Sequence, residues 1–164
     1  MDCMTPDFEF SQELLGVNTH EVLDYWHLKK KGMLAPTWKH FELMDVHSSV
    51  PIILVLDAEQ QDDQVRYKYR FVGTKIVRNR WKLDKPDHTG LYFEDVQHQY
   101  DVDEMKRAYD ECYNSKRPVL MKRHFDALDA SGEHERLVLP LITEDGEVDK
   151  LVCVLERLKE TKKW

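Results

Sequence analysis

The sequence predicts a single α+β domain in which a five-stranded antiparallel sheet carries its helices on one face. Three observations lead to this prediction. The chain has 164 residues, 41% apolar and 34% charged, with only six glycines and six prolines, a balance typical of one compact domain. Its segments follow the order two strands, short helices, three strands. Short polar turns join the strands, which favours antiparallel pairing.

The first clear element is a helix that follows an amino-terminal extension at residues 1–17. Asn18 can cap this helix with Glu21 as the reciprocal partner of a capping box. Gly32, after three consecutive lysines, is a suitable stop. At helical spacing, one face of the helix then carries Val22, Tyr25 and Trp26.

Two strands are predicted next, from Ile52 to Asp57 and from Val65 to Val72. The polar segment between them suggests an antiparallel hairpin. In the second strand, apolar and aromatic residues alternate with Arg66, Lys68 and Arg70. This period of two buries one face of the strand and leaves the cations on the other.

The middle of the chain is helical, and three strands complete the domain. Thr74 can cap a short helix that runs through Arg80, and Asp101 a longer amphipathic helix from Val102 to about Ser115. The last strands are expected at residues 119–126, 135–141 and 150–158, separated by turns rich in Gly and Asp. The domain therefore spans residues 18–158, and residues 159–164 form a basic tail.

Charge and composition exclude several classes of protein. The formal net charge of −7 disfavours non-specific binding of nucleic acid. The longest apolar run, Ile52 to Leu56, is far too short to span a bilayer, and the first thirty residues lack a signal-peptide pattern. Cys3, Cys112 and Cys153 are too widely spaced for a disulfide framework. We therefore expect a cytoplasmic protein with no nucleic-acid partner and no membrane insertion.

Several segments of the chain resemble a known family. Residues 66–74 read Arg-Tyr-Lys-Tyr-Arg-Phe-Val-Gly-Thr, Arg-Pro-Val follows at residues 117–119, and residues 135–141 read Glu-Arg-Leu-Val-Leu-Pro-Leu. With the Asp-Gly turn at residues 145–146, this set is similar to the PAS-like family of short stand-alone α-proteobacterial proteins. The resemblance implies strand order 2-1-5-4-3 and a sensory role. Residues 81–87 depart from the family's pattern.

A ligand pocket is expected between the sheet and its helices, where a cluster of aromatic residues would converge. The candidates are Tyr67, Tyr69, Phe71, Trp81, Tyr92 and Phe93. Simple core packing is the favoured alternative explanation for the same residues. Arg123 and His124 alternate on the third strand, so one of them faces the helices and can hold an acidic ligand. The alternative is that both face solvent or pair across the hairpin.

No cofactor or catalytic motif is visible. The eight histidines include no pair spaced for metal binding on a helix. The helix from Thr74 to Arg80 holds neither a histidine for haem nor the reactive cysteine of flavin photoreceptors of this fold. Phosphate-binding glycine loops and nucleophile elbows are absent from the sequence. We therefore expect neither a metal site nor a cofactor.

The leading hypothesis is a stand-alone, non-catalytic regulatory module. It binds a small apolar or weakly acidic molecule, or a signalling-protein partner, and reports through its amino-terminal helix. Val22, Tyr25 and Trp26 would pack on a second copy, giving a homodimer, or on the open sheet face. One alternative is a small enzyme that uses His124 with Asp126 or Glu135 for proton transfer. The other is a structural adaptor without a ligand.

Overall fold

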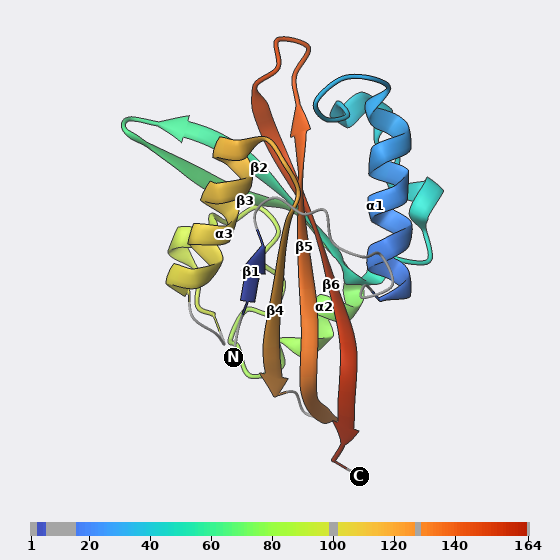
Figure 1. The fold of residues 1–164 in the computed structure, drawn as a ribbon. Helices are drawn as coiled ribbons and strands as arrows, with labels where there is room; N and C mark the ends of the chain where they lie inside the picture. Colours follow the sequence, from blue (N-terminus) through green and yellow to red (C-terminus); the bar gives the residue numbers. More distant parts are fainter. Residues whose placement is uncertain (1–2, 6–15, 99–101, 127–128, 164) are drawn as a thin grey trace.

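The computed structural model describes residues 3–5, 16–98, 102–126 and 129–163, which form an α+β fold (Figure 1). The main strands are β2 (Ile53–Gln61), β3 (Gln64–Val72), β4 (Val119–Asp126), β5 (Ala130–Ile142) and β6 (Val148–Lys162). They form an antiparallel sheet in the order β4-β5-β6-β2-β3. Counted among these five strands from the β3 edge, this is the order 2-1-5-4-3. The predicted sheet topology is therefore confirmed.

Helices cover both faces of the sheet. Neighbouring residues of β5 show this, because Glu135 accepts a hydrogen bond from Gly16 at the start of α1 (Val17–Lys30), whereas Arg136 donates one to Tyr109 of α3 (Val102–Ser115). Successive side chains of a strand point to opposite faces. Figure 1 shows α1 and α3 on opposite sides of the strands. The short α2 (Thr74–Asn79) shares the face of α3.

The packing of α3 follows directly from its sequence pattern. Its apolar residues recur at spacings of three and four, and they are completely buried against the sheet. These residues are Met105, Ala108, Tyr109 and Cys112. The opposite side of α3 carries acidic and basic side chains. The helix is therefore amphipathic and packs on the sheet through its apolar side.

A short edge strand and four 3-10 helices complete the described chain. The edge strand β1 (Cys3–Thr5) pairs with β4. It lies in the amino-terminal extension, where no strand was predicted. The 3-10 helices are η2 (Trp38–His40), η3 (Leu43–Val46), η4 (Val50–Ile52) and η5 (Phe93–Asp95). The first three connect α1 to β2, and η5 leads toward α3.

The predicted cap of α1 is wrong. The N-cap residue is Gly16 and not Asn18, and Gly16 offers no side-chain oxygen. Glu156 of β6 supplies the acceptors instead, because its carboxylate binds the backbone amides of Asn18 and Thr19 at 3.1 and 2.7 Å. A residue distant in sequence therefore satisfies the first turn, which no local pattern could indicate.

The β5–β6 hairpin is longer than predicted. Gly132, expected in a turn, lies inside β5, where a β-carbon would overlap the backbone carbonyl of Lys159. Glycine is therefore needed for close approach of the two strands. The expected basic tail largely belongs to β6, which continues to Lys162.

Candidate functional site

A pocket of about 430 Å³ opens on the sheet face that carries α2. Its walls come from α2 and the turn after it, from residues 97–98, and from β4, β5 and β6. The cationic side chains in the wall are Arg80, Lys82, Arg123, Arg136 and Arg157. The imidazoles are His98, His124 and His134, and the one carboxylate among the lining residues is Asp126. Apolar side chains close the remainder: Ile52, Ile76, Leu83 and Leu155.

The strand register explains why these cations converge. Directly paired residues of antiparallel strands project from the same face. Two neighbouring rows across β4, β5 and β6 are Arg123, His134, Arg157 and Met121, Arg136, Leu155. Like charges in such a row repel one another. Because the two rows are adjacent, Arg123, Arg136 and Arg157 lie close together on the floor of the pocket and concentrate positive charge there.

Two of the three buried arginines of the wall, Arg80 and Arg136, make contacts with aromatic residues and His88. Arg80 follows α2 directly and is 5% exposed; its Nη1 lies 2.8 Å from His88 Nδ1, and its guanidinium stacks over the Tyr69 ring. Within the described part of the chain, Arg80 Nη2 has no hydrogen-bond partner. Arg136 is 1% exposed and donates from Nη1 to the Tyr109 hydroxyl at 2.7 Å. A buried donor without an acceptor is costly, so Arg80 is poised for an incoming acceptor.

Two other cations of the pocket, Arg123 and Arg157, form ion pairs with carboxylates. Arg123 Nη1 lies 3.1 Å from Glu104 of α3. Arg157 Nη1 lies 3.4 Å from Asp129 and 3.3 Å from Glu160. These ion pairs fix the positions of the two side chains and neutralise part of the charge at the mouth.

Two imidazoles of the wall, His98 and His134, are neutral near pH 7. Burial, followed by three neighbouring guanidinium groups, lowers the pKa of His134 to about 3. Burial is also the largest cause of the lowered pKa of His98, about 4, although a hydrogen bond with the Phe93 carbonyl acts in the opposite direction. A neutral imidazole can donate through one nitrogen and accept through the other. A bound anion would favour protonation of either ring.

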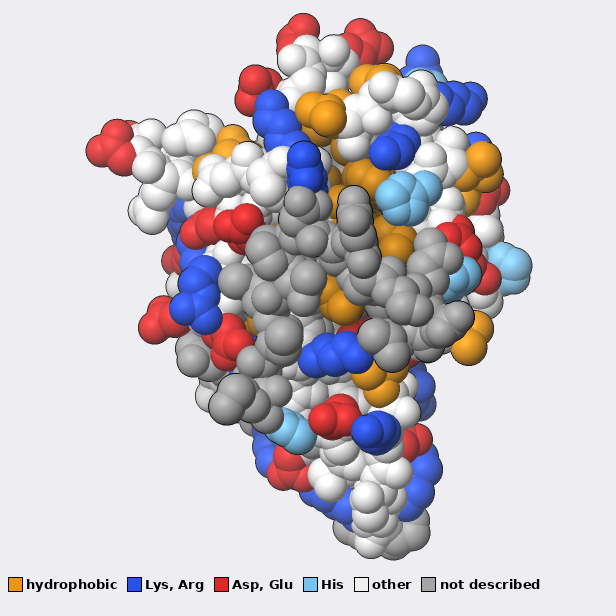
Figure 2. Space-filling model, viewed as in Figure 1, with side chains coloured by type: hydrophobic (Ala, Val, Ile, Leu, Met, Phe, Trp, Pro, Cys, Tyr) orange, Lys and Arg blue, Asp and Glu red, His pale blue; other side chains and the backbone are white. Residues whose placement is uncertain are grey.

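The charge of the pocket differs from that of the protein as a whole. The chain carries a net charge of −7, and basic and acidic side chains are interspersed over the face seen in Figure 2. The pocket places five cations against Asp126. A concave site of this size and charge is suited to a small anion.

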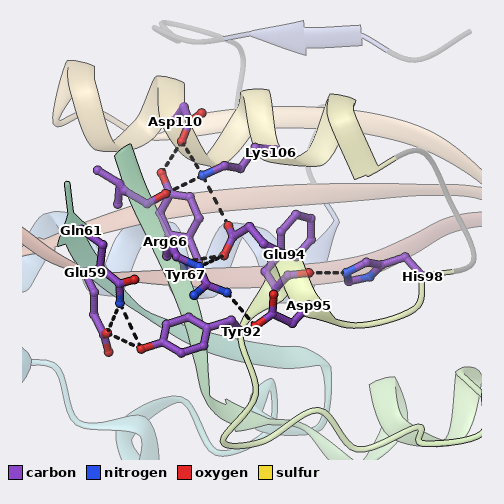
Figure 3. Close-up of polar contacts among 12 residues, drawn as sticks. Glu59, Gln61, Arg66, Tyr67, Tyr92, Glu94, Asp95, His98, Lys106 and Asp110 are labelled. Atoms are coloured by element: carbon purple, nitrogen blue, oxygen red, sulfur yellow. Dashed lines mark hydrogen bonds and ion pairs between the residues drawn. The ribbon is translucent and has the colours of Figure 1, made fainter. Parts of the chain in front are cut away.

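A network of polar contacts holds the wall at His98 in place (Figure 3). The carboxylate of Glu94 in η5 forms two ion pairs. One is with Arg66 of β3, whose Nε lies at 3.6 Å, and the other is with Lys106 of α3, whose Nζ lies at 3.3 Å. Farther along the same segment, His98 Nε2 lies 3.1 Å from the Phe93 carbonyl. The network thereby ties the segment from η5 to His98 to both the sheet and α3.

The residues just before η5 cover the outer edge of β3. The amide of Tyr69 donates to the Leu91 carbonyl at 2.8 Å, and the amide of Gly90 donates to the Tyr69 carbonyl at 2.7 Å. Lys68 forms an isolated bridge with Tyr92. These contacts satisfy backbone groups that an open edge would expose.

Of the predicted pocket residues, Arg123 and His124 line the pocket. Arg123 is the buried one of the pair and faces α3, while His124 is exposed. The expectation that one residue of the pair faces the helices and can meet an acidic ligand therefore fits the geometry.

The predicted aromatic residues lie outside the pocket wall. Tyr67, Tyr69 and Phe93 are buried in the core, where ring contacts join Tyr67 and Phe93 to Tyr109 at 5.4 and 5.1 Å. The others are Phe71, half-buried against the core, Trp81, which is 45% exposed, and Tyr92, whose hydroxyl donates to Glu59 at 2.6 Å. Of the two explanations left open, core packing accounts for the buried rings.

The predicted dimer residues pack within the chain. Val22 and Trp26 are 0% and 2% exposed, and Trp26 Nε1 donates to the Pro140 carbonyl at 2.8 Å. Tyr25 is half-buried and donates to Asp45 at 2.6 Å. The open sheet face, and not a second copy, therefore receives this face of α1. The homodimer stays a prediction without a located interface.

The pocket is lined by two of the three residues of the alternative enzyme. His124 and Asp126 line it, whereas Glu135 does not and accepts instead from the Gly16 amide at 2.7 Å. Burial raises the pKa of the Glu135 carboxyl. The Glu135 carboxylate is thus engaged at the start of α1, and the alternative of an enzyme stays a prediction.

Sequence reasoning missed most of the cations and imidazoles of the pocket wall: Arg80, Lys82, His98, His134, Arg136 and Arg157. His134 and Arg136 stand two apart on β5, a spacing that places them on one face. That signal was hidden because the strand was expected to begin at Glu135. Arg80 was assigned only as the end of a helix.

No protein-family model matches the chain, and a search of curated proteins finds none similar to it. The PAS-like resemblance therefore stays a prediction from the sequence segments, to which the strand order adds agreement in fold. No helix in the described ranges is long and apolar enough to cross a membrane. Within those ranges, no group of three or more His, Cys, Asp or Glu side chains is arranged to hold a metal ion.

Proposed function

We propose that this chain is a PAS-like regulatory module of the cytoplasm that binds a small anion and performs no catalysis. The observation that carries the proposal is the convergence of five cationic side chains on one pocket of about 430 Å³ in an acidic chain. Buried free thiols at Cys112 and Cys153 support a reducing compartment.

An anion would relieve two unfavourable features of the pocket. It would give Arg80 Nη2 the acceptor that this buried atom lacks among the described residues. It would also neutralise the repulsion along the row of Arg123, His134 and Arg157. Charge-assisted hydrogen bonds from guanidinium groups are among the stronger polar contacts in proteins.

Occupancy of the pocket can be reported through α1. Two carboxylates hold the amino-terminal end of this helix: Glu135 at Gly16, and Glu156 at Asn18 and Thr19. Each carboxylate adjoins pocket residues on its own strand, Glu135 between His134 and Arg136, and Glu156 between Leu155 and Arg157. A shift of either strand on ligand binding would therefore reach the first turn of α1 on the opposite face.

The test is a thermal-shift screen of small anions, combined with native mass spectrometry of the protein purified from its own host. Anions should raise the midpoint temperature in a concentration-dependent way. R80Q should abolish this response. R78Q, the same change at an exposed arginine of α2, is the matched control. A screen without stabilising anions, and a protein that retains no anionic molecule, would refute the proposed function.

A further inference from the structure

We infer that the ligand is an amphipathic carboxylic acid, whose carboxylate meets the guanidinium groups while its apolar body lies against Ile52, Ile76, Leu83 and Leu155. This inference rests on the proposed function, because it names the class of anion that the same pocket takes.

The wall is divided into a charged side and an apolar side. Arg136 of β5 pairs with Leu155 of β6, and Ile53 pairs with Val154 of β6, so Ile52 continues the row beside Leu155. Across the sheet, the side chains therefore change from guanidinium to aliphatic between β5 and the start of β2.

Helix α2 and the turn after it extend the apolar side above the sheet. Ile76 and Leu83 line the pocket and are only 5% and 8% exposed, and α2 packs against η4, which ends at Ile52. Arg80 lies between these two residues in sequence and brings its guanidinium into the same cavity. A ligand that contacts Arg80 is consequently within reach of both walls.

The cavity is too large for an inorganic anion alone. A volume of about 430 Å³ can hold a ligand of up to about 20 non-hydrogen atoms at ordinary packing density. A free phosphate or acetate ion would leave the aliphatic wall in contact with water, whereas an aryl or alkyl group would bury it.

The donors of the pocket are side chains. None of the lining residues in the described part of the chain is a glycine, so the wall lacks the glycine-rich amide cradle by which many proteins bind phosphate. A planar guanidinium matches a carboxylate in two parallel hydrogen bonds. Asp126 in the wall opposes additional negative charge. A single carboxylate therefore fits better than a multiply charged phosphate.

Isothermal titration calorimetry of the whole chain tests this inference with matched probes. The acids are phenylacetate and indole-3-acetate, the neutral controls are their primary amides, and the small anions are acetate and inorganic phosphate. We expect indole-3-acetate to bind at least about 10-fold more tightly than its amide, because the amide loses the charge-assisted contacts. We expect a similar advantage over acetate, which lacks the apolar body.

Paired variants locate the two halves of the ligand. L155T should weaken the binding of indole-3-acetate by about 3- to 10-fold and leave acetate unchanged, since it shortens the apolar wall. L158T, the same change at a half-buried leucine outside the wall, is its control. R80Q should weaken both acids relative to R78Q. Circular dichroism spectra establish that each variant is folded.

The outcomes separate the inference from the proposed function. If phosphate or acetate binds as tightly as indole-3-acetate and R80Q weakens that binding, the anion site stands and the amphipathic class is wrong. If the amides bind as well as the acids, the carboxylate assignment is wrong. If no anion binds wild-type protein, both the inference and the proposed function fail.

Discussion

Replacing Glu156 tests how α1 is attached to the sheet, on which the proposed output depends. Its Oε1 accepts from the Thr19 amide at 2.7 Å and the Thr19 hydroxyl at 2.9 Å. Its Oε2 accepts from the Asn18 backbone amide at 3.1 Å and the Asn18 side-chain amide at 2.9 Å. Since Gly16 caps nothing with a side chain, this carboxylate is the acceptor for the first turn of α1.

The magnitude follows from these four hydrogen bonds. A glutamine has one carbonyl oxygen, so E156Q would turn an amide group toward two of the four donors and would remove the charge from all of them. Asn18 is half-buried and can turn to water, whereas Thr19 is fully buried. We expect E156Q to lower the free energy of unfolding by about 1–2 kcal/mol and E156A, which strands the Thr19 amide, by about 3 kcal/mol.

Urea denaturation followed by circular dichroism measures these losses, and amide hydrogen exchange shows whether the first turn of α1 opens separately. E133Q is the control, because Glu133 forms only an ion pair of 3.6 Å with the exposed Lys159 and should change the stability by less than about 0.5 kcal/mol. An E156Q protein as stable as E133Q, with unchanged exchange in α1, would refute the reasoning.

Three further predictions concern stability. W26F removes a buried donor to the Pro140 carbonyl and leaves a small cavity. It should therefore lower the free energy of unfolding, measured by urea denaturation, by about 2 kcal/mol. A loss below about 0.5 kcal/mol would contradict the packing of α1 on the sheet. G132A should lower the melting temperature, with a cost of at least about 2 kcal/mol, because its methyl group would overlap the Lys159 carbonyl; an unchanged melting temperature would exclude this close approach. His134 has a pKa of about 3 when folded against 6.5 when unfolded, so the unfolded chain binds more protons below about pH 6.5 and stability falls as the pH falls, by up to about 2 kcal/mol at pH 5. H134Q should reduce the slope of stability against pH between 5 and 6.5, and an unchanged slope would show that His134 is not buried as a neutral ring.

Local patterns were sufficient to predict most of the fold. The alternation in β3 and the helical spacing in α3 both follow the burial of one face, and the structure confirms these elements. The ends of the elements were less accurate. The start of α1 depends on Glu156, and the length of β5 depends on the contact between Gly132 and Lys159. Such tertiary contacts are invisible in a window of neighbouring residues.

The candidate site could be predicted only in part. Arg123 and His124 were identified because a single strand places one of them toward the helices. The partners of Arg123 in the charged row are His134 and Arg157, which lie on two other strands. Knowledge of the register is needed to bring them together, and a one-residue error in register would send each to the opposite face. The aromatic residues, in contrast, gave a strong but misleading signal, because large rings fill a core as readily as they line a cavity.

The pocket lies where the sheet carries an unfavourable arrangement of cross-strand side chains. Cross-strand neighbours of like charge are unfavourable, yet Arg123, His134 and Arg157 stand in one row, next to the row of Arg136. The chain lessens this cost by keeping His134 neutral and by pairing Arg123 with Glu104 at the mouth. A packed apolar row would stabilise the sheet more, so stability alone does not account for the arrangement. The proposed anion, bound between these rows, would account for it, because its negative charge would offset the repulsion between the arginines.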